Sequence, residues 1–589
     1  MANDDLPWGR RLVICCDGTW QSSVSSREYV PSNVTKLCRV IARVGNDRND
    51  PKKKWHQIVY YDSGVGTGNL SKSERRRQGG TGAGLAENVI EAYNFIVLNY
   101  EPGDEIFCFG FSRGAYTARA VAGLVTDIGV IRPLDMQIFP QVYRAYQLND
   151  EGLPFRETQA WKDFTQGKLT KRGRELSKTT GDDSKWGIKD RAQSWDIHPH
   201  VDLEASEKSR KVKVVGVWDT VGSLGVPDVA IFDNANYRTK YGFHNVRLNE
   251  NIQHAYHALA LDERRKAFRP TLWYIPKDLP AKLAKEGKPM PELKQVWFPG
   301  VHINIGGGSD DCIGEMKGDL EQISNATFAW MLQVISPHLT IDQDAFHVSL
   351  VRYQRWLERI RWACTYHHTN WIDWAKNKLP HIPFINPAAD ELSPPKRDPP
   401  HPHPTFDYGW GTGNIVQSYA GMYKLAGAVP RVPGHCQTEI YDAEAKQPIL
   451  VDIHRYGETN EYMHPICAYR NLVRGNEPDS ALRDFERRFV EYRSTGGAAC
   501  IDNPSGKGRY WWYRKNNAKP MPEWIILRNG DAGAEDGDVN FERSWYGQCE
   551  QSPQTRQKLE AAGVKKDWLT DVDERVDFSL GDRAAWMYP

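Results

Sequence analysis

The sequence predicts an α/β fold in which a mostly parallel central sheet is flanked by helices. The first 125 residues alternate short apolar runs of strand length with longer stretches whose apolar positions recur at helical spacing. This alternation is typical of strand–helix–strand units, in which each crossover brings the chain back parallel to the previous strand. The second observation is a Gly-x-Ser-x-Gly motif that lies between one such run and a helix-like stretch.

The apolar runs and the helical spacing define the predicted elements along the chain. Strands are predicted at residues 11–16, 58–61, 105–109, 211–218 and 295–298, and we expect the sheet to continue to about residue 310. Helices are predicted at residues 85–100, 251–261, 325–335 and 353–362, with another directly after Ser112. Short aromatic runs bounded by Pro, Asn and Gly predict hairpin strands at 510–513 and 524–527.

The length of the chain predicts more than one structural region. A chain of 589 residues exceeds what one hydrophobic core usually fills. We expect the α/β domain over residues 1–375, with a charged insertion or cap at about 150–210. Nine prolines within residues 376–405 predict a loop or linker there. Residues 406–589 are predicted to be a mixed C-terminal extension that packs on the first domain.

Charge and hydropathy exclude several classes of partner. The 76 Lys and Arg residues nearly balance the 75 Asp and Glu residues, so no overall field favours nucleic acid. No apolar run is long enough for a transmembrane segment, so contact with a membrane would be peripheral. The N-terminal segment lacks the apolar stretch of a secretory signal, and none of the ten cysteines forms a Cys-x-x-Cys pair. We therefore expect a cytoplasmic protein, and the sequence leaves its oligomeric state open.

The Gly-x-Ser-x-Gly motif has the context that a nucleophile elbow needs. The buried strand at 105–109 precedes it, and a helix-like stretch follows. Gly110 and Gly114 are the small residues that keep the sharp turn around Ser112 free of clashes. A glycine-flanked serine that merely caps a helix is the alternative, but the strand–turn–helix context favours the elbow. The sequence therefore predicts an α/β-hydrolase-like fold with Ser112 as the nucleophile.

Two further residues complete a predicted catalytic triad. In this fold class the acid and then the histidine follow the serine along the chain, on loops after later strands. Asp219 directly follows the apolar run 214–218, although an Asp there also suits a simple cap. His302 follows the run 296–298 beside flexible glycines, where it can act as general base. Spacing alone leaves three competing histidines: His254, His257 and His464.

An oxyanion hole is predicted from two backbone segments. One donor is the N–H of Arg113, the residue after the nucleophile. The second is expected at the turn after the first strand, where Gly18 and Thr19 follow an aspartate. A plain Asp-Gly turn is an equal alternative for that segment.

Several segments together resemble the family of type VI secretion phospholipase effector-like catalytic domains, long catalogued as a domain of unknown function. The resemblance covers roughly residues 10–335, with a patch near 460, and the long chain resembles the fungal members. It implies an α/β-hydrolase fold and phospholipase activity through Ser112, Asp219 and His302. The segments that carry it are 16–19, 61–67, 110–119, 218–221, 259–265, 296–308 and 460–465.

The residues after His302 depart from the pattern of this family. Its members usually have Ser-Asp-Val there, whereas this chain has Ile303, Asn304 and Ile305, and Ser309 replaces the aromatic residue that closes the glycine run. An Asn in place of an Asp removes a negative charge beside the imidazole, so the tuning of His302 is expected to differ.

No cofactor or metal is expected. The glycine-rich stretches 64–68 and 79–84 lack the P-loop pattern and no dinucleotide-binding unit surrounds them. Histidine pairs at 198/200, 367/368 and 401/403 have no Cys or Glu at ligand spacing.

The sequence thus predicts a serine hydrolase that cleaves a carboxylic ester through an acyl-enzyme, with a lipid or phospholipid as the first candidate substrate. A small-ester or amide hydrolase is an alternative. Another is a non-catalytic binding or scaffold protein that retains the hydrolase fold.

Overall fold

A computed structural model gives the architecture of the chain. It describes residues 8–18, 30–50, 52–64, 85–137, 207–221, 247–308, 318–367, 409–415, 427–442, 447–475, 480–491, 508–515, 520–527, 539–549 and 552–561, with short pieces within 139–162 and 417–424. Most of the predicted insertion at 150–210 and all of the predicted linker at 376–405 lie outside these residues, as do Thr19 and the glycine run 79–84.

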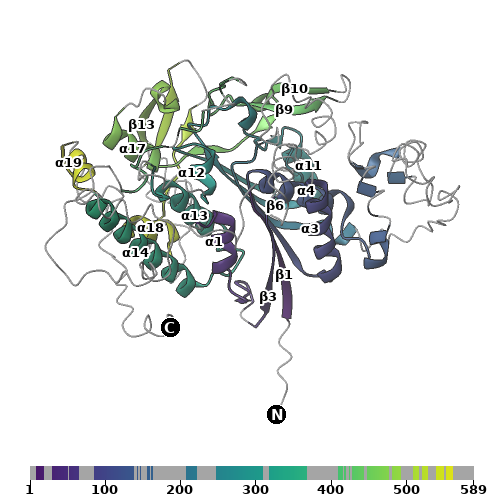
Figure 1. The fold of residues 1–589 in the computed structure, drawn as a ribbon. Coiled ribbons are helices and arrows are strands. Elements are labelled where there is room, and N and C mark those ends of the chain that lie inside the picture. The colour runs from purple at the N-terminus through teal and green to yellow at the C-terminus, as the bar shows by residue number, and fades with distance from the viewer. Residues whose placement is uncertain are drawn as a thin grey trace, which may run out of the picture.

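An eight-stranded sheet forms the centre of the molecule, in the order β12-β8-β6-β5-β4-β1-β3-β2 (Figure 1). Neighbouring strands run parallel, except that β2 pairs antiparallel with β3 at one edge. The strands are β1 Trp8–Cys16, β2 Val44–Asn46, β3 Lys54–Asp62, β4 Glu105–Phe111, β5 Val212–Trp218, β6 Ile252–Ala260, β8 Glu292–Phe298 and β12 Glu461–Met463. The predicted fold class, a mostly parallel sheet flanked by helices, is confirmed.

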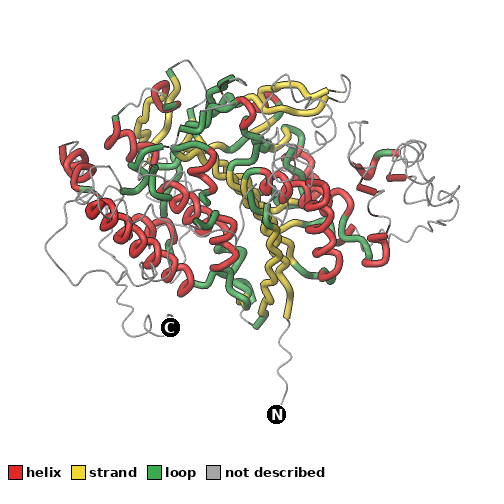
Figure 2. The backbone as a smooth tube through the Cα atoms, viewed as in Figure 1, coloured by secondary structure: helices red, strands yellow, loops and turns green. Residues whose placement is uncertain are grey.

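Helices cover both faces of this sheet (Figure 2). Alternate residues of β1 point to opposite faces, so Val13 and Cys15 belong to one buried cluster and Leu12 and Ile14 to the other. The helices on the first face include α1 Asn33–Val40, α13 Gln322–Ile335 and α14 Gln343–His367. The helices on the second face are α3 Leu85–Asn99, α4 Arg113–Ile128 and α11 Leu279–Glu286.

One predicted helix is wrong. Residues 251–261 were expected to be helical, but Ile252–Ala260 is strand β6 in the middle of the sheet. Its last six residues are all buried, so apart from the buried His257 the segment is apolar on both faces and lacks polar–apolar alternation. Periodicity cannot separate such a run from a buried helix, and its three alanines favour helix by propensity. The other predicted strands and helices of the first 367 residues are confirmed. Most of their ends shift by a few residues, but the helix predicted at 353–362 is part of the longer α14, which begins at Gln343.

The C-terminal region contributes to the same sheet. The strand β12 pairs parallel with β8. The sheet therefore includes a strand from the C-terminal region, although it was predicted to end near residue 310. The aromatic run at 510–513 lies in β14 and pairs with β13, as expected for a hairpin, whereas residues 524–527 are not a strand. The remaining strands are β7 Ile275–Pro276, β9 Gln437–Asp442, β10 Gln447–Asp452, β11 Gly457–Glu458, β13 Phe485–Glu491, β14 Gly508–Arg514 and β15 Met521–Pro522. The remaining helices are α12 His302–Gly306, α17 Ile466–Arg474, α18 Phe541–Gln548 and α19 Pro553–Ala561.

Among the helices in the described part of the chain, none has the length and apolarity needed to cross a bilayer.

Candidate active site

Ser112 lies at a sharp turn between strand β4 and helix α4. Its φ of 57° and ψ of −122° lie in a region that L-residues rarely adopt. The Ser112 N–H donates to the carbonyl of Trp218 on the neighbouring strand, at 3.1 Å, and this bond holds the turn at the end of the sheet. Backbone strain of this kind is what a nucleophile elbow stores to expose its side chain.

The two glycines of the motif are required by close backbone contacts. A Cβ atom on Gly110 would lie 2.3 Å from the Gly114 carbonyl oxygen. A Cβ atom on Gly114 would lie 2.2 Å from the carbonyl oxygen of Cys16 at the end of β1. Helix α4 can therefore leave the turn directly against the sheet only because both positions lack a side chain.

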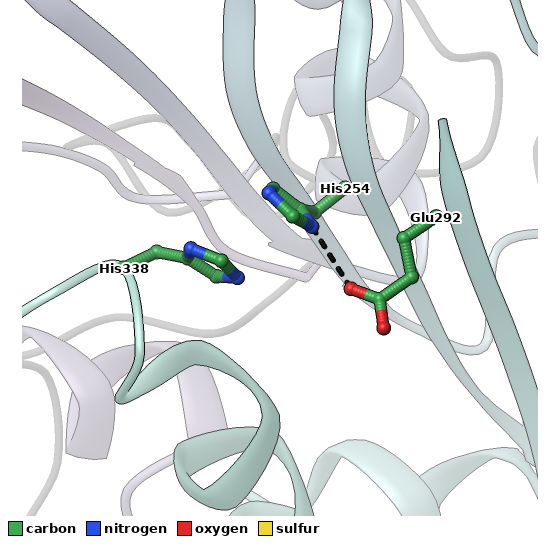
Figure 3. A group of neighbouring side chains, drawn as sticks. All are labelled: His254, Glu292 and His338. Atoms are coloured by element: carbon green, nitrogen blue, oxygen red, sulfur yellow. Dashed lines mark hydrogen bonds and ion pairs between the residues drawn. The ribbon is translucent and has the colours of Figure 1, made fainter. Parts of the chain in front are cut away.

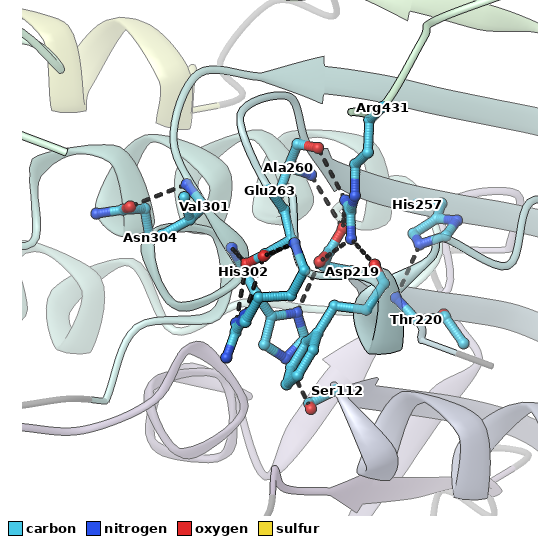
Figure 4. A network of polar contacts seen from close by, with 12 residues as sticks. Ser112, Asp219, Thr220, His257, Ala260, Glu263, Val301, His302, Asn304 and Arg431 are labelled. Carbon is cyan, nitrogen blue, oxygen red and sulfur yellow. Dashed lines mark hydrogen bonds and ion pairs between the residues drawn. The ribbon is translucent and has the colours of Figure 1, made fainter. Parts of the chain in front are cut away.

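The side chains of Ser112, His302 and Asp219 form a continuous hydrogen-bonded chain (Figure 4). The distance from Ser112 Oγ to His302 Nε2 is 2.7 Å, and that from His302 Nδ1 to Asp219 Oδ2 is 2.6 Å. The residues come from the carboxyl ends of β4, β5 and the segment after β8, which meet at one edge of a parallel sheet. The structure thus brings together the three residues that the sequence singled out.

The imidazole of His302 is buried between aromatic rings. Phe111 stacks on it with ring centroids 4.8 Å apart, and the edge of Phe268 contacts it at 4.9 Å. The His302 backbone N–H donates to the buried carboxylate of Glu263 at 3.2 Å, and Arg265 forms an ion pair with that carboxylate at 2.8 Å. These contacts fix both the ring plane and the start of helix α12.

Burial lowers the pKa of His302 below its ordinary value, and the neighbouring Asp219 carboxylate opposes this only in part. The imidazole is therefore neutral at neutral pH. With Nδ1–H donating to Asp219, Nε2 carries the lone pair toward Ser112. This is the tautomer that a general base for the serine requires.

Asp219 is fully buried and ionised. Its Oδ1 accepts the N–H of Ala260 at 3.0 Å, while Arg431 contacts both carboxylate oxygens, at 2.5 Å and 3.0 Å. Burial alone would raise the pKa of this carboxyl, but the charge of Arg431 and the hydrogen bonds from His302 and Arg431 outweigh burial and lower the pKa well below its usual range. The carboxylate is therefore held as an anion in a site that excludes water.

Arg431 is the main site residue that the sequence did not reveal. Its guanidinium also donates to the carbonyls of Ala260 and Phe268, at 2.8 Å and 2.7 Å, and its side chain is 2% exposed. It lies 212 residues beyond Asp219, in the C-terminal region, and no local motif marks it. Glu263 lies in a segment that the family resemblance included, but its contact with His302 follows only from the fold.

The expected oxyanion donors have different surroundings. Arg113 begins helix α4, and the first N–H groups of a helix have no partner within that helix. The Gly18 N–H instead donates to the side chain of Asp17, at 2.8 Å. Asp17 also accepts from Ser32 and Tyr61, so this aspartate ties the turn to its neighbours. Thr19 lies outside the described residues. For the Gly18 N–H to serve as the second oxyanion donor, it would have to leave the Asp17 side chain and donate to the substrate.

The competing histidines lie away from Ser112 in hydrogen-bonded positions of their own. His257 accepts the N–H of Thr220 at 3.1 Å, and burial lowers its pKa to about 3. His464 contacts Glu542 at 2.9 Å. His254 lies beside Glu292 near the start of β6.

Asn304, which stands where the family usually has an aspartate, is buried within helix α12. Its Oδ1 accepts the N–H of Val301 at 3.0 Å, which closes the turn that leads to His302. Its side chain also hydrogen-bonds Asp319, a buried carboxyl whose pKa burial raises to about 6. An aspartate at position 304 would place a second carboxylate against Asp319, so the asparagine suits these surroundings.

A cavity of about 290 Å³ is lined in part by Arg431, which also contacts Asp219. Its walls combine arginine and aspartate side chains with apolar ones. Ser112 is not among its lining residues, so this cavity does not mark where an acyl group would bind.

Three comparisons relate this chain to known proteins. A family model described as "T6SS, Phospholipase effector Tle1-like, catalytic domain" matches residues 10–334. The uncharacterized protein YEL023C of Saccharomyces cerevisiae is 24% identical over 285 residues, which are 46% of this chain and 34% of the yeast protein. This chain therefore spans about a third of the length of that relative.

Two solved structures are also similar. One is the Tle1 effector bound to the VgrG spike from the type 6 secretion system, with 18% identity, a TM-score of 0.25 and 51% of each chain covered. The other is an uncharacterized protein from Pseudomonas aeruginosa, with 14% identity, a TM-score of 0.30, and 58% of this chain and 48% of that chain covered. This chain thus spans about half of each.

Proposed function

Because the chain belongs to the family of Tle1-like phospholipase effector catalytic domains, a family of phospholipase-type hydrolases, we propose that it is a serine hydrolase that cleaves a carboxylic ester through an acyl-enzyme. The observation that carries the proposal is the hydrogen-bonded chain from Ser112 Oγ through His302 to Asp219, with distances of 2.7 Å and 2.6 Å. This chain starts at a strained elbow, where a serine side chain is held out of regular backbone structure.

In the first half of the reaction the Ser112 hydroxyl attacks the ester carbonyl, and His302 Nε2 accepts the hydroxyl proton. Asp219 stabilises the imidazolium that forms. Its carboxylate stays ionised because the positive charge of Arg431 lies against it. The oxyanion of the tetrahedral intermediate accepts a hydrogen bond from the Arg113 N–H. His302 then returns the proton to the leaving alcohol as the C–O bond breaks.

In the second half a water molecule attacks the acyl-Ser112 ester. His302 takes a proton from this water and later returns it to Ser112 Oγ, which releases the carboxylic acid and restores the site. All of these proton transfers pass through His302 Nε2, so His302 acts in both halves of the reaction and Asp219 orients it in both.

We propose a lipid, and a phospholipid first, as the ester. The name of the family supports this substrate class. A small-ester or amide substrate is the competing proposal, and a scaffold protein without activity is the alternative outside the enzymes.

A substrate panel with a matched serine variant tests this proposal. Purified protein is assayed against phospholipid vesicles, triacylglycerol emulsions and short p-nitrophenyl esters, alongside Ser112→Ala and the control Ser336→Ala, a serine at the end of α13. We expect Ser112→Ala to lower kcat by about 10⁴- to 10⁶-fold, whereas Ser336→Ala retains activity. Turnover of short esters alone would reject the lipid substrate. The absence of any turnover that depends on Ser112 would reject the enzyme.

A further inference from the structure

Figure 3 shows a second cluster of reactive side chains. It lies near the starts of β6 and β8, whereas Ser112 follows the end of the parallel strand β4, so the two groups are at opposite ends of the sheet. His254 on β6 and Glu292 on β8 are directly paired across the two strands, near the start of each. His338 approaches from the turn that follows α13. One ligand atom from each residue lies within 4.8 Å of the other two.

The distances within this cluster suit one ion with short bonds. A tetrahedral zinc ion with bonds of about 2.0–2.2 Å holds its ligand atoms roughly 3.4 Å apart. His254 Nδ1 and Glu292 Oε2 are already 2.9 Å apart. The two imidazole rings stack with centroids 3.8 Å apart and their planes 29° from parallel, so the His338 ring has to turn for its nitrogen lone pair to meet that of His254 at one ion.

Neighbouring groups orient these ligands. The Tyr256 hydroxyl donates to Glu292 Oε2 at 2.6 Å and contacts His338 Nε2 at 3.3 Å. Lys294 forms an ion pair with the other oxygen of Glu292, Oε1, so Oε2 is the oxygen that faces the imidazoles.

The cluster is accessible from solvent. The side chains of His254 and Glu292 are 22% and 36% exposed, which is enough for an ion to reach them. Three protein ligands leave one position of a tetrahedron for water.

We propose that His254, Glu292 and His338 bind a zinc ion or a similar divalent transition-metal ion. Two imidazoles and a carboxylate favour such ions over Mg²⁺ and Ca²⁺, which prefer oxygen ligands alone. The ion clamps strands β6 and β8 to the turn after α13. A network of hydrogen bonds that never takes up a metal is the alternative for the same residues.

This ion would take no part in the chemistry at Ser112. His254 lies opposite Val214 of β5, four residues before Trp218, which lies opposite Phe111. At about 3.3 Å per strand residue the two sites are about 13 Å apart along the sheet. The proposed ion therefore lies apart from Ser112, and the quantities that report on it are zinc binding and the stability of the fold.

The test is zinc binding to the full-length protein without a histidine tag, measured by isothermal titration calorimetry and by thermal unfolding. We expect one equivalent of Zn²⁺ to bind and to raise the unfolding temperature, and Mg²⁺ to do neither. His338→Ala, and separately Tyr256→Phe, should weaken zinc binding by about 10- to 100-fold. His56→Ala removes an exposed histidine on β3 and should leave binding unchanged.

Two results would overturn the proposal. One is the failure of the wild-type protein to bind a stoichiometric Zn²⁺ ion, which decides the matter even if a variant does not fold. The other is zinc binding of equal affinity in the wild type and in His338→Ala, which would place the ion on other residues.

Discussion

Replacing Arg431 by methionine tests how the C-terminal region supports the site. The change removes a buried cation that contacts both oxygens of Asp219 and donates to the carbonyls of Ala260 and Phe268. The methionine fills most of the space with an apolar chain. Asp219 then stays buried with His302 and the Ala260 N–H as its partners.

The expected loss of stability follows from this geometry. A pair of unit charges 4 Å apart interacts with about 4 kcal/mol at an effective dielectric constant of 20, and the contacts here are shorter. Desolvation offsets much of that attraction in the intact pair, but removal of one partner leaves the other charge buried. We therefore expect the free energy of unfolding to fall by about 3–5 kcal/mol at pH 7.

The loss should depend on pH in a defined direction. The folded-state pKa of Asp219 lies below its unfolded value of about 3.9. The stabilisation by the pair is therefore complete above that unfolded value and is lost as the pH falls through the folded-state value. The difference between wild type and Arg431→Met should be largest near neutral pH and should shrink in more acidic buffers.

Urea unfolding of four proteins provides the assay: wild type, Arg431→Met, Asp219→Asn and the double variant. The two changes should be non-additive by about 0.5–3 kcal/mol, because each removes the same contact. In parallel, displacement of the triad should lower kcat by about 10²-fold in Arg431→Met. Arg455→Met removes an exposed arginine of the same region and serves as the control. Additive effects, or an Arg431→Met protein as stable as the control, would refute this account of Arg431.

Other substitutions and conditions test the elbow, the base and the sheet edge. The acid limb of kcat/KM should have an apparent pKa below 6.5, because burial keeps His302 neutral; a limb at or above that value in a pH–rate profile would contradict it. Gly114→Ala should destabilise the fold by about 1–3 kcal/mol or more, although alanine favours helix, because its Cβ meets backbone atoms. Gly123→Ala in the same helix meets only the Tyr146 hydroxyl at 3.0 Å and should cost less in thermal unfolding. A chain that ends at residue 405 lacks β12 and Arg431, and we expect limited proteolysis to degrade it faster.

Local pattern was sufficient for the elbow and for most of the sheet. The strand before Ser112 is apolar on both faces, and the two glycines lie where a Cβ atom would meet backbone atoms. Asp219 and His302 follow strand signals in the chain order of the fold class, so their approach to Ser112 could be expected once the sheet was assumed to be parallel. These features depend on neighbours in the chain, which a single sequence contains.

Features that depend on distant segments could not be predicted. Strand β6 is buried on both faces, and alanine-rich apolar runs of that kind also suit a helix. The contact of Arg431 with Asp219 joins residues 212 positions apart, and charge pairing alone does not select one arginine among many. The cluster of His254, Glu292 and His338 depends on strand register and on the turn after α13, so ligand spacing along the chain gives no sign of it.

The most direct test of the central proposal is covalent labelling of the nucleophile. Intact protein is treated with a fluorophosphonate, and the adduct is located by peptide mass spectrometry in the wild type, Ser112→Ala and His302→Ala. The account predicts one adduct, on Ser112, absent from Ser112→Ala and formed far more slowly in His302→Ala. A wild-type protein that stays unlabelled, or an adduct at equal yield in Ser112→Ala, would contradict it.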